Sequence, residues 1–150
     1  MEKKTILIIL IAIFLLIFIS FMGYTYIAKE KVTVGSVNFT LPSGFKEGII
    51  DGEFDANITN GTHAIYINEY NDNNISKFID EYKNEHNAKN ESVLIFNLTI
   101  DGKTIYKSSN NVTNANHYWF IENNKTYSIY NWGYTPNMDN IVFDLIKSMS

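Results

Sequence analysis

An uncharged, strongly apolar run from Thr5 to Ala28 constrains this chain more than any other feature of its sequence. Such a run is long enough for a helix to cross the roughly 30 Å of hydrocarbon in a bilayer. A cleaved signal peptide would have a shorter apolar stretch followed by small residues, whereas Tyr26 stands where a small residue would be needed. The sequence therefore predicts that residues 1–28 form a cytoplasmic stub and a retained transmembrane helix.

Lysines on either side of this run predict its orientation. Lys3 and Lys4 precede the run and favour a cytoplasmic amino terminus, although Lys29 and Lys31 just beyond it reduce the charge difference. We expect a single-pass protein of the cell membrane, held in the membrane by its N-terminal helix. Residues 29–150 would then form one domain outside the cytoplasm.

The composition of the chain excludes several classes of function. It contains no cysteine, so disulfides, thiolate nucleophiles and sulfur-ligated metals are excluded. All of its basic residues are lysines, and the net charge of −4 leaves no basic patch suited to nucleic acid. We therefore expect no nucleic-acid partner and no cofactor.

Turn signals divide the first half of the domain into short strands. Polar and apolar side chains alternate over residues 32–41, which is the period of a strand with one wet face, and Gly35-Ser36 can turn this segment into a hairpin. After the turn Pro42-Ser43-Gly44, further strands are expected at 46–50, 53–59 and 63–70.

Two hairpins are expected in the second half. The first joins residues 92–100 to 103–108 through Asp101-Gly102, and the second joins 115–122 to 125–132 through Asn123-Asn124. Both dipeptides tolerate the positive φ that tight hairpin turns require.

Two segments have the helical period instead. Residues 75–87 carry an apolar stripe, with Asn74 as the expected N-cap. The terminal helix is expected to begin with Thr135 as N-cap and Pro136 at its first position. Its apolar stripe comprises Met138, Ile141, Val142, Leu145, Ile146 and Met149. The pattern predicts an α+β domain, in which an antiparallel β-sheet of hairpins packs with two amphipathic helices.

The segment VNFTLPSGFK, residues 37–46, is a short alternating strand that closes in Leu-Pro-Ser-Gly-Phe. It resembles the opening of small PsbP-like domains, and the order of hairpins and helices also fits that family. With its anchor and its many asparagines, the chain resembles small membrane-anchored PsbP-like proteins of methanogenic archaea. The resemblance implies a PsbP-like fold and an assembly or binding module rather than an enzyme, and it brings no catalytic residues.

One motif is enriched, the N-glycosylation acceptor Asn-x-Ser/Thr. It occurs at Asn38, Asn57, Asn60, Asn74, Asn90, Asn97, Asn111 and Asn124. Either some of these asparagines are glycosylated, or an Asn-rich chain produces the motif whenever a strand alternates polar and apolar residues.

Three histidines, His63, His86 and His117, are the obvious candidates for metal binding or acid–base chemistry. They have no metal-ligand spacing, and no nucleophile motif accompanies them. We expect them to be ordinary surface or rim residues.

Asp51, Glu53 and Asp55 would share one face of a strand and could bind a hard cation such as calcium. The EF-hand pattern fails, however, because Ala56 and Thr62 stand where it requires glycine and glutamate. A solvated edge strand is the preferred interpretation.

Aromatic residues concentrate near the end of the chain. Alternation places His117, Trp119 and Ile121 on one face of a strand and Tyr118 and Phe120 on the other, so at least one set belongs to the core. The other set is either covered or forms a binding platform for sugar or peptide. The candidate residues of this aromatic binding surface are Tyr118, Tyr130, Trp132 and Tyr134.

These features favour a non-enzymatic binding or envelope-associated module, with an envelope protein or a glycan as its partner. One alternative is a small cell-surface hydrolase that uses His117 or His63 with carboxylates. It requires a pocket that brings a histidine, a carboxylate and a hydroxyl together in steps of about 3 Å. The other alternative is a structural subunit of a membrane assembly, although the anchor lacks a Gly-x-x-x-Gly pattern for tight helix pairing.

Overall fold

A computed structural model describes residues 9–20, 30–50, 52–110, 115–132 and 137–150, which fall into two compact units, Met1–Glu30 and Lys31–Ser150. In the first unit residues 9–20 are helical, and their large apolar side chains are exposed. No helix within the described ranges is both long enough and apolar enough to cross a membrane. The remainder of the expected span lies outside the described residues, and the transmembrane helix stays a prediction.

The second unit is an α+β domain built on an antiparallel sheet, as expected. In its described part the sheet has seven strands in the order β3-β4-β5-β9-β8-β7-β6, and β1 and β2 pair separately as a hairpin. The strands are β1 (Lys31–Val34), β2 (Val37–Thr40), β3 (Lys46–Glu47), β4 (Ala56–Thr59), β5 (Ala64–Tyr70), β6 (Val93–Ile100), β7 (Lys103–Asn110), β8 (Asn116–Glu122) and β9 (Lys125–Trp132).

The three predicted hairpin turns are confirmed. Gly35 turns β1 into β2 with a φ of 58°. Asp101 and Gly102 both have positive φ between β6 and β7, and Asn123 and Asn124 do so between β8 and β9. Glycine, asparagine and aspartate adopt this conformation at the lowest cost, which is why these turns can be located in the sequence.

Two predicted strands are shorter than expected. The strand predicted at 46–50 is reduced to Lys46–Glu47, and the one predicted at 53–59 begins only at Ala56. Just before β4, the Asp55 carboxylate accepts a hydrogen bond from the backbone N–H of Glu69 at 2.7 Å. This side-chain contact adds to the backbone hydrogen bond that Asp55 N–H donates to the Ile67 carbonyl at 3.1 Å. Strand β3 is the edge strand next to β4 in the described sheet. The acidic segment with Glu53 and Asp55 therefore does not form the edge strand that the sequence suggested.

Both helices form, and the N-cap predicted for the first of them is confirmed in position. Helix α2 spans Ile75–Ala88, and Asn74 occupies its N-cap without a side-chain capping bond. Asp72 instead accepts a hydrogen bond from the backbone of Asn74 at 2.9 Å. Helix α3 spans Met138–Lys147 with Asn137 at the N-cap, while residues 135 and 136, the predicted start, lie outside the described residues.

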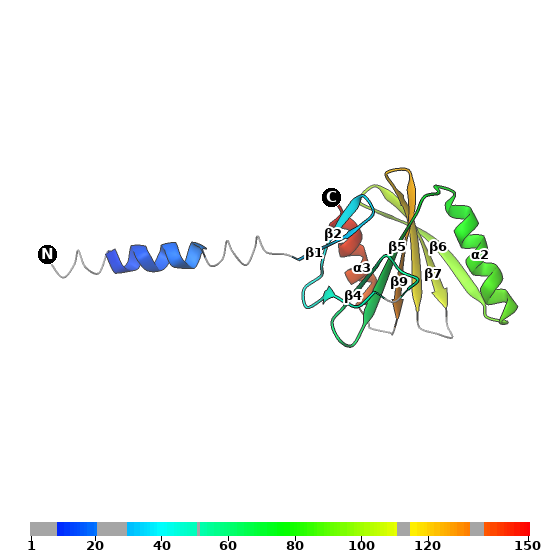
Figure 1. Ribbon diagram of the computed structural model, residues 1–150, viewed down its shortest axis with the longest axis horizontal. Helices are drawn as coiled ribbons and strands as arrows, with labels where there is room; N and C mark the ends of the chain where they lie inside the picture. The colour runs from blue at the N-terminus through cyan, green and yellow to red at the C-terminus, as the bar shows by residue number, and fades with distance from the viewer. Residues whose placement is uncertain (1–8, 21–29, 51, 111–114, 133–136) are drawn as a thin grey trace. The chain divides into compact units, whose positions relative to one another are not determined.

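The two helices lie on opposite sides of the sheet (Figure 1). Helix α3 and the β1–β2 hairpin pack together on one side, where the backbones of Asn38 and Ser150 exchange hydrogen bonds of 2.9 and 3.1 Å. We call the sheet face beneath them the closed face. Helix α2 packs on the other side, which we call the open face, where the Tyr82 ring contacts the Trp119 ring at 5.1 Å.

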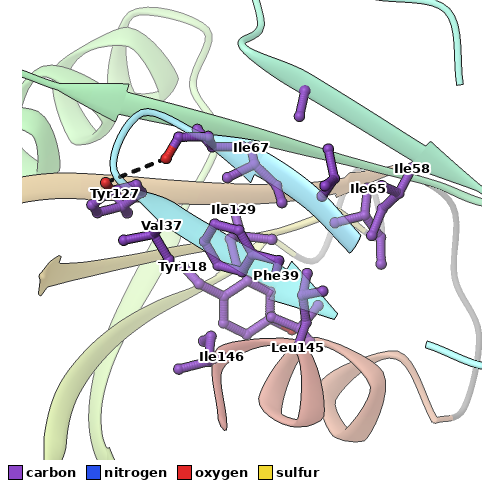
Figure 2. Packing of buried hydrophobic residues seen from close by; sticks show 14 of the residues in the cluster. Val37, Phe39, Ile58, Ile65, Ile67, Tyr118, Tyr127, Ile129, Leu145 and Ile146 are labelled. Carbon is purple, nitrogen blue, oxygen red and sulfur yellow. Dashed lines mark hydrogen bonds between the residues drawn. The ribbon is translucent and has the colours of Figure 1, made fainter. Parts of the chain in front are cut away.

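The hydrophobic core fills the space between the closed face, the β1–β2 hairpin and α3 (Figure 2). Apolar residues of alternating strand positions meet there, as the period of a strand requires. Phe39 of the hairpin, Tyr118 of the sheet and Leu145 of the helix are all fully buried. The apolar stripe predicted for the terminal helix is confirmed, because Met138, Val142, Leu145 and Ile146 are buried.

A half-buried carboxylate, that of Glu69, ties the hairpin to the sheet. Glu69 of β5 accepts hydrogen bonds from the Tyr127 hydroxyl, from Lys125 Nζ at 2.5 Å and from the Ser36 backbone at 3.3 Å. Burial alone would raise the pKa of Glu69, but the hydrogen bonds from Lys125 and Tyr127 outweigh burial and hold the pKa below its usual range. A Cβ on Gly35 would collide with this carboxylate.

Candidate functional site

A cleft of about 570 Å³ opens on the open face, beside helix α2. We call it the aromatic cleft. Strands β5, β8 and β9 supply its floor through Asn68, Tyr70, His117, Ser128, Tyr130 and Trp132. Helix α2 and the segments around it supply its walls through Glu53, Phe54, Tyr82, Glu85, His86, Lys89, Glu91 and Ala115. Its volume lies in the range of small-molecule sites, about 300–1,000 Å³.

Antiparallel pairing explains how the floor is assembled. Tyr130 pairs with Tyr66 of β5 on one side and with His117 of β8 on the other, so all three side chains project from the open face. Trp132 follows two positions after Tyr130 and therefore shares that face. Trp132 is 64% exposed, and its ring centroid lies 6.3 Å from that of Tyr130. A large exposed ring next to a hollow is typical of binding surfaces.

His117 lies enclosed in rings at the base of the cleft. Its ring stacks on Trp119 at 4.3 Å and contacts Tyr82 at 5.2 Å and Tyr130 at 5.5 Å. Burial lowers its pKa to about 3, with a smaller contribution from His86 when that ring is charged. His117 is therefore neutral at pH 7. Its Nε2 is buried without a hydrogen-bond partner among the described residues.

Two pairs of charged side chains in the wall are bonded to each other, and the remaining carboxylate, Glu53, is exposed. Glu91 Oε2 lies 2.5 Å from His86 Nδ1, and both of these side chains are mostly buried. Lys89 Nζ donates to Glu85 Oε1 at 2.7 Å, and this hydrogen bond lowers the pKa of Glu85. The cleft thus combines aromatic surface with two charge pairs that are compensated within the wall.

A chain of hydrogen bonds fixes α2 against the sheet. The His117 backbone N–H donates to Ser108 Oγ at 3.0 Å, and Ser108 Oγ donates to the Tyr82 hydroxyl at 3.3 Å. Burial raises the pKa of Tyr82, so this phenol stays protonated at neutral pH. The position of Tyr82 in the wall is therefore set by β7 and β8.

Of the three histidines predicted to be ordinary surface or rim residues, only His117 departs from that placement, because rings enclose it at the base of the cleft. His86 and His117 both line the aromatic cleft, whereas His63 lies just before β5 and does not line it. The histidine–carboxylate pair in the cleft is His86–Glu91, whereas the hydrolase hypothesis named His117 or His63. The hydroxyl of Tyr82, in the wall of the cleft, is hydrogen-bonded to that of Ser108. The hydrolase hypothesis stays a prediction.

The candidate aromatic surface is corrected in part. Tyr130 and Trp132 line the cleft, but Tyr118 is fully buried on the closed face, where its hydroxyl donates to Asp139 Oδ1 at 2.5 Å. The sequence pattern showed which residues share a face but not which face is covered. Tyr134 lies outside the described residues. Phe54 and Tyr82 were missed because they reach the cleft from a loop and a helix.

The glycosylation motifs fall into groups of different exposure. Asn60, Asn74, Asn90, Asn97 and Asn124 are exposed. Asn38 and Asn57 are half-buried, and their Nδ2 atoms donate to the carbonyl oxygens of Ser150 at 3.5 Å and Ile49 at 2.8 Å. Asn111 lies outside the described residues. Because a glycan is attached through Nδ2, the exposed group offers the better acceptors.

The acidic segment does not assemble a cation site in the described part of the chain, where no group of three or more potential metal ligands is found. Asp55 is engaged with the Glu69 backbone, Glu53 lies at the cleft, and Asp51 is outside the described residues.

Comparison with known proteins places the fold. No protein-family model matches the sequence, and no curated protein matches it. Among solved structures, the chain is similar to cyanobacterial PsbP (CyanoP) from Synechocystis sp. PCC 6803. The match has a TM-score of 0.51 and 11% sequence identity, and it covers 81% of this chain and 91% of CyanoP. The fold resembles that of PsbP. At this identity the likeness concerns the fold alone, and it agrees with the resemblance seen in residues 37–46.

Proposed function

We propose that this chain is a single-pass membrane protein whose domain lies outside the cytoplasm and binds an envelope glycan or protein, without catalysing a reaction. It would be one of the small membrane-anchored PsbP-like proteins of methanogenic archaea. The observation that carries the binding role is the aromatic cleft, with Trp132 exposed at its floor. Large aromatic side chains that are exposed to solvent and do not pack in the core are typical of ligand-binding surfaces.

The membrane location rests on the first unit. The uncharged run from Thr5 to Ala28 has the length of a span, and the helical residues 9–20 expose large apolar side chains on every side. A helix that is apolar all round needs an apolar environment such as a bilayer or a large protein core.

Protease treatment of spheroplasts tests the topology. We expect protease added outside intact spheroplasts to remove residues 30–150 and leave a short membrane-bound fragment. A cytoplasmic protein of the same cells serves as the control for integrity. Protection of the domain until the membrane is broken would refute an outward-facing domain.

Photocrosslinking tests the binding role. A photoreactive phenylalanine analogue in place of Trp132 should couple the full-length protein, in its own membranes, to an envelope glycan or protein. The same analogue in place of Phe96, which is 48% exposed on β6 and does not line the cleft, is the matched control. Equal crosslinking from both positions, or none from Trp132, would remove the cleft as the binding site.

Glycosylation of the domain is part of the proposal, since five of the acceptor motifs are exposed. Intact-mass measurement of protein from its own cells should show glycans at some of Asn60, Asn74, Asn90, Asn97 and Asn124, and none at Asn57. Occupancy of Asn57 would contradict this assignment, because its Nδ2 is already bonded to the carbonyl of Ile49.

A further inference from the structure

The chemistry of the aromatic cleft restricts its ligand further. This step rests on the proposed function, because it takes the cleft to be the binding site. Three classes of ligand suit a cleft lined by rings and carboxylates: an organic cation, a peptide and a neutral sugar.

A cation is disfavoured by the charges in the wall. Glu85 of α2 and Glu91 just after it are each already bonded to a basic side chain, at 2.7 and 2.5 Å. A cationic ligand could pair with either of them only by displacing Lys89 or His86. The third carboxylate of the wall, Glu53, is exposed to solvent, where its attraction for a cation is weakened by water and salt. The base of the cleft also keeps His117 neutral, which shows that a positive charge there is poorly compensated.

A peptide that binds by strand addition is disfavoured by the position of the cleft. Peptides that bind by strand addition need the free backbone groups of a sheet edge. The floor of the cleft is formed by β5, β9 and β8, which are interior strands whose backbones pair with each other. The cleft therefore offers side chains and no row of free backbone donors.

A neutral sugar fits what remains. The exposed ring of Trp132 and the neighbouring Tyr130 give flat apolar surfaces on which the C–H faces of a pyranose can stack. Tyr70 and Glu53 line other parts of the same cleft. The hydroxyls of Tyr130 and Tyr70 can donate or accept hydrogen bonds with sugar hydroxyls, and the Glu53 carboxylate can accept them. We propose that the aromatic cleft binds a neutral saccharide stacked on Trp132.

Binding can be measured on the full chain in phosphatidylcholine nanodiscs, which avoid sugar-headed detergents. The probes are cellobiose, maltose and N,N′-diacetylchitobiose, with tetramethylammonium as the cationic comparison. The chain has two tryptophans, of which Trp119 is buried and Trp132 is exposed. A blue shift of the tryptophan fluorescence during titration therefore indicates that a ligand has shielded Trp132 from water. We expect at least one disaccharide to give a saturable blue shift.

Variants locate the site. Trp132→Ala should weaken the binding of that disaccharide about tenfold or more, measured by calorimetry, because a tenfold loss corresponds to one lost contact of about 1.4 kcal/mol. Trp132→Phe, which keeps a ring, should weaken it less. Phe96→Ala is the matched control and should leave affinity unchanged.

The outcomes separate the ligand class from the function. Failure of all three disaccharides, saturable binding of tetramethylammonium in their place, or unchanged affinity in Trp132→Ala would each overturn the saccharide assignment. If the photoreactive residue at position 132 still crosslinks an envelope protein, the binding role stands and only the ligand class is wrong. Without such a crosslink, both fall.

Discussion

The two faces of the sheet carry the same kinds of residue but differ in how completely they are covered. On the closed face the β1–β2 hairpin and α3 leave Tyr118, Phe120 and Ile129 with no exposed surface. On the open face α2 buries Trp119 but leaves Trp132 64% exposed. One strand hairpin, β8–β9, thus contributes to a packed core on one side and to a cleft on the other. The contrast indicates that aromatic content alone does not identify a binding surface. A ring belongs to the core or to a binding surface according to whether a helix or hairpin packs over it.

The largest effect expected on the closed face comes from truncating a leucine of its core. Leu145 is fully buried between α3 and the sheet. Leu145→Ala should lower the free energy of unfolding by about 2–5 kcal/mol, because truncation of a buried leucine loses transfer free energy and leaves a cavity. Lys147→Ala, on the exposed side of the same helix, should change it by less than about 0.5 kcal/mol. Chemical denaturation of both variants measures the difference, and equal midpoints would show that α3 is not part of the core.

A pH-dependent effect is expected from the open face. The pKa of His117 is lowered from 6.5 to about 3 in the folded protein, so between these values the unfolded chain binds more protons. Stability should therefore fall as pH falls below 6.5, by up to about 1.4 kcal/mol per pH unit, or about 2 kcal/mol by pH 5.

The variant His117→Gln cannot take up this proton and isolates the contribution. Denaturation midpoints of both proteins, measured from pH 7 to pH 4, should converge as the pH falls, because only the wild type loses the His117 contribution. Parallel curves would mean that the folded protein accommodates a charged imidazole at this site.

A smaller effect is expected where the hairpin meets the sheet. Gly35→Ala adds a Cβ at a φ of 58° and against the Glu69 carboxylate, which Tyr127 and Lys125 hold in place. The expected loss is about 1–2 kcal/mol, from backbone strain and displacement of Glu69. Gly61→Ala is the matched control, since Gly61 also has positive φ but no atom would meet the added Cβ. A loss no greater than that of the control would assign the whole effect to the backbone.

Local signals in the sequence predicted much of this architecture. The Asp101-Gly102 and Asn123-Asn124 turns, the one-sided helices and the alternation within β8 depend on neighbouring residues, and all of them are found. The start of α2 was also predicted at the correct residue, although the Asn74 side chain makes no capping bond.

The candidate site depends on contacts between segments that are distant in the sequence, and local sequence patterns did not predict these contacts. The pairing of β5 with β9 brings Tyr66 beside Tyr130, and the packing of α2 brings His86 into the cleft with His117. No local pattern specifies either contact. Alternation placed Tyr118 and Trp119 on opposite faces correctly, yet the choice between the faces depended on where α2 and α3 dock.

The smallest expected effect sharpens the comparison between the faces. Because Trp132 is 64% exposed and lies at the end of β9, Trp132→Ala should change the free energy of unfolding by less than about 0.5 kcal/mol. Trp119→Ala, two strand positions from His117 on the same face, should cost about 3–5 kcal/mol, because its ring is fully packed. Paired denaturation curves of the two variants provide the test. An unchanged free energy of unfolding in Trp132→Ala would show that the exposed ring is not needed for folding. Any loss of binding in that variant would then report on the cleft itself. A large destabilisation would instead assign Trp132 to the fold and remove the main reason for placing a ligand there.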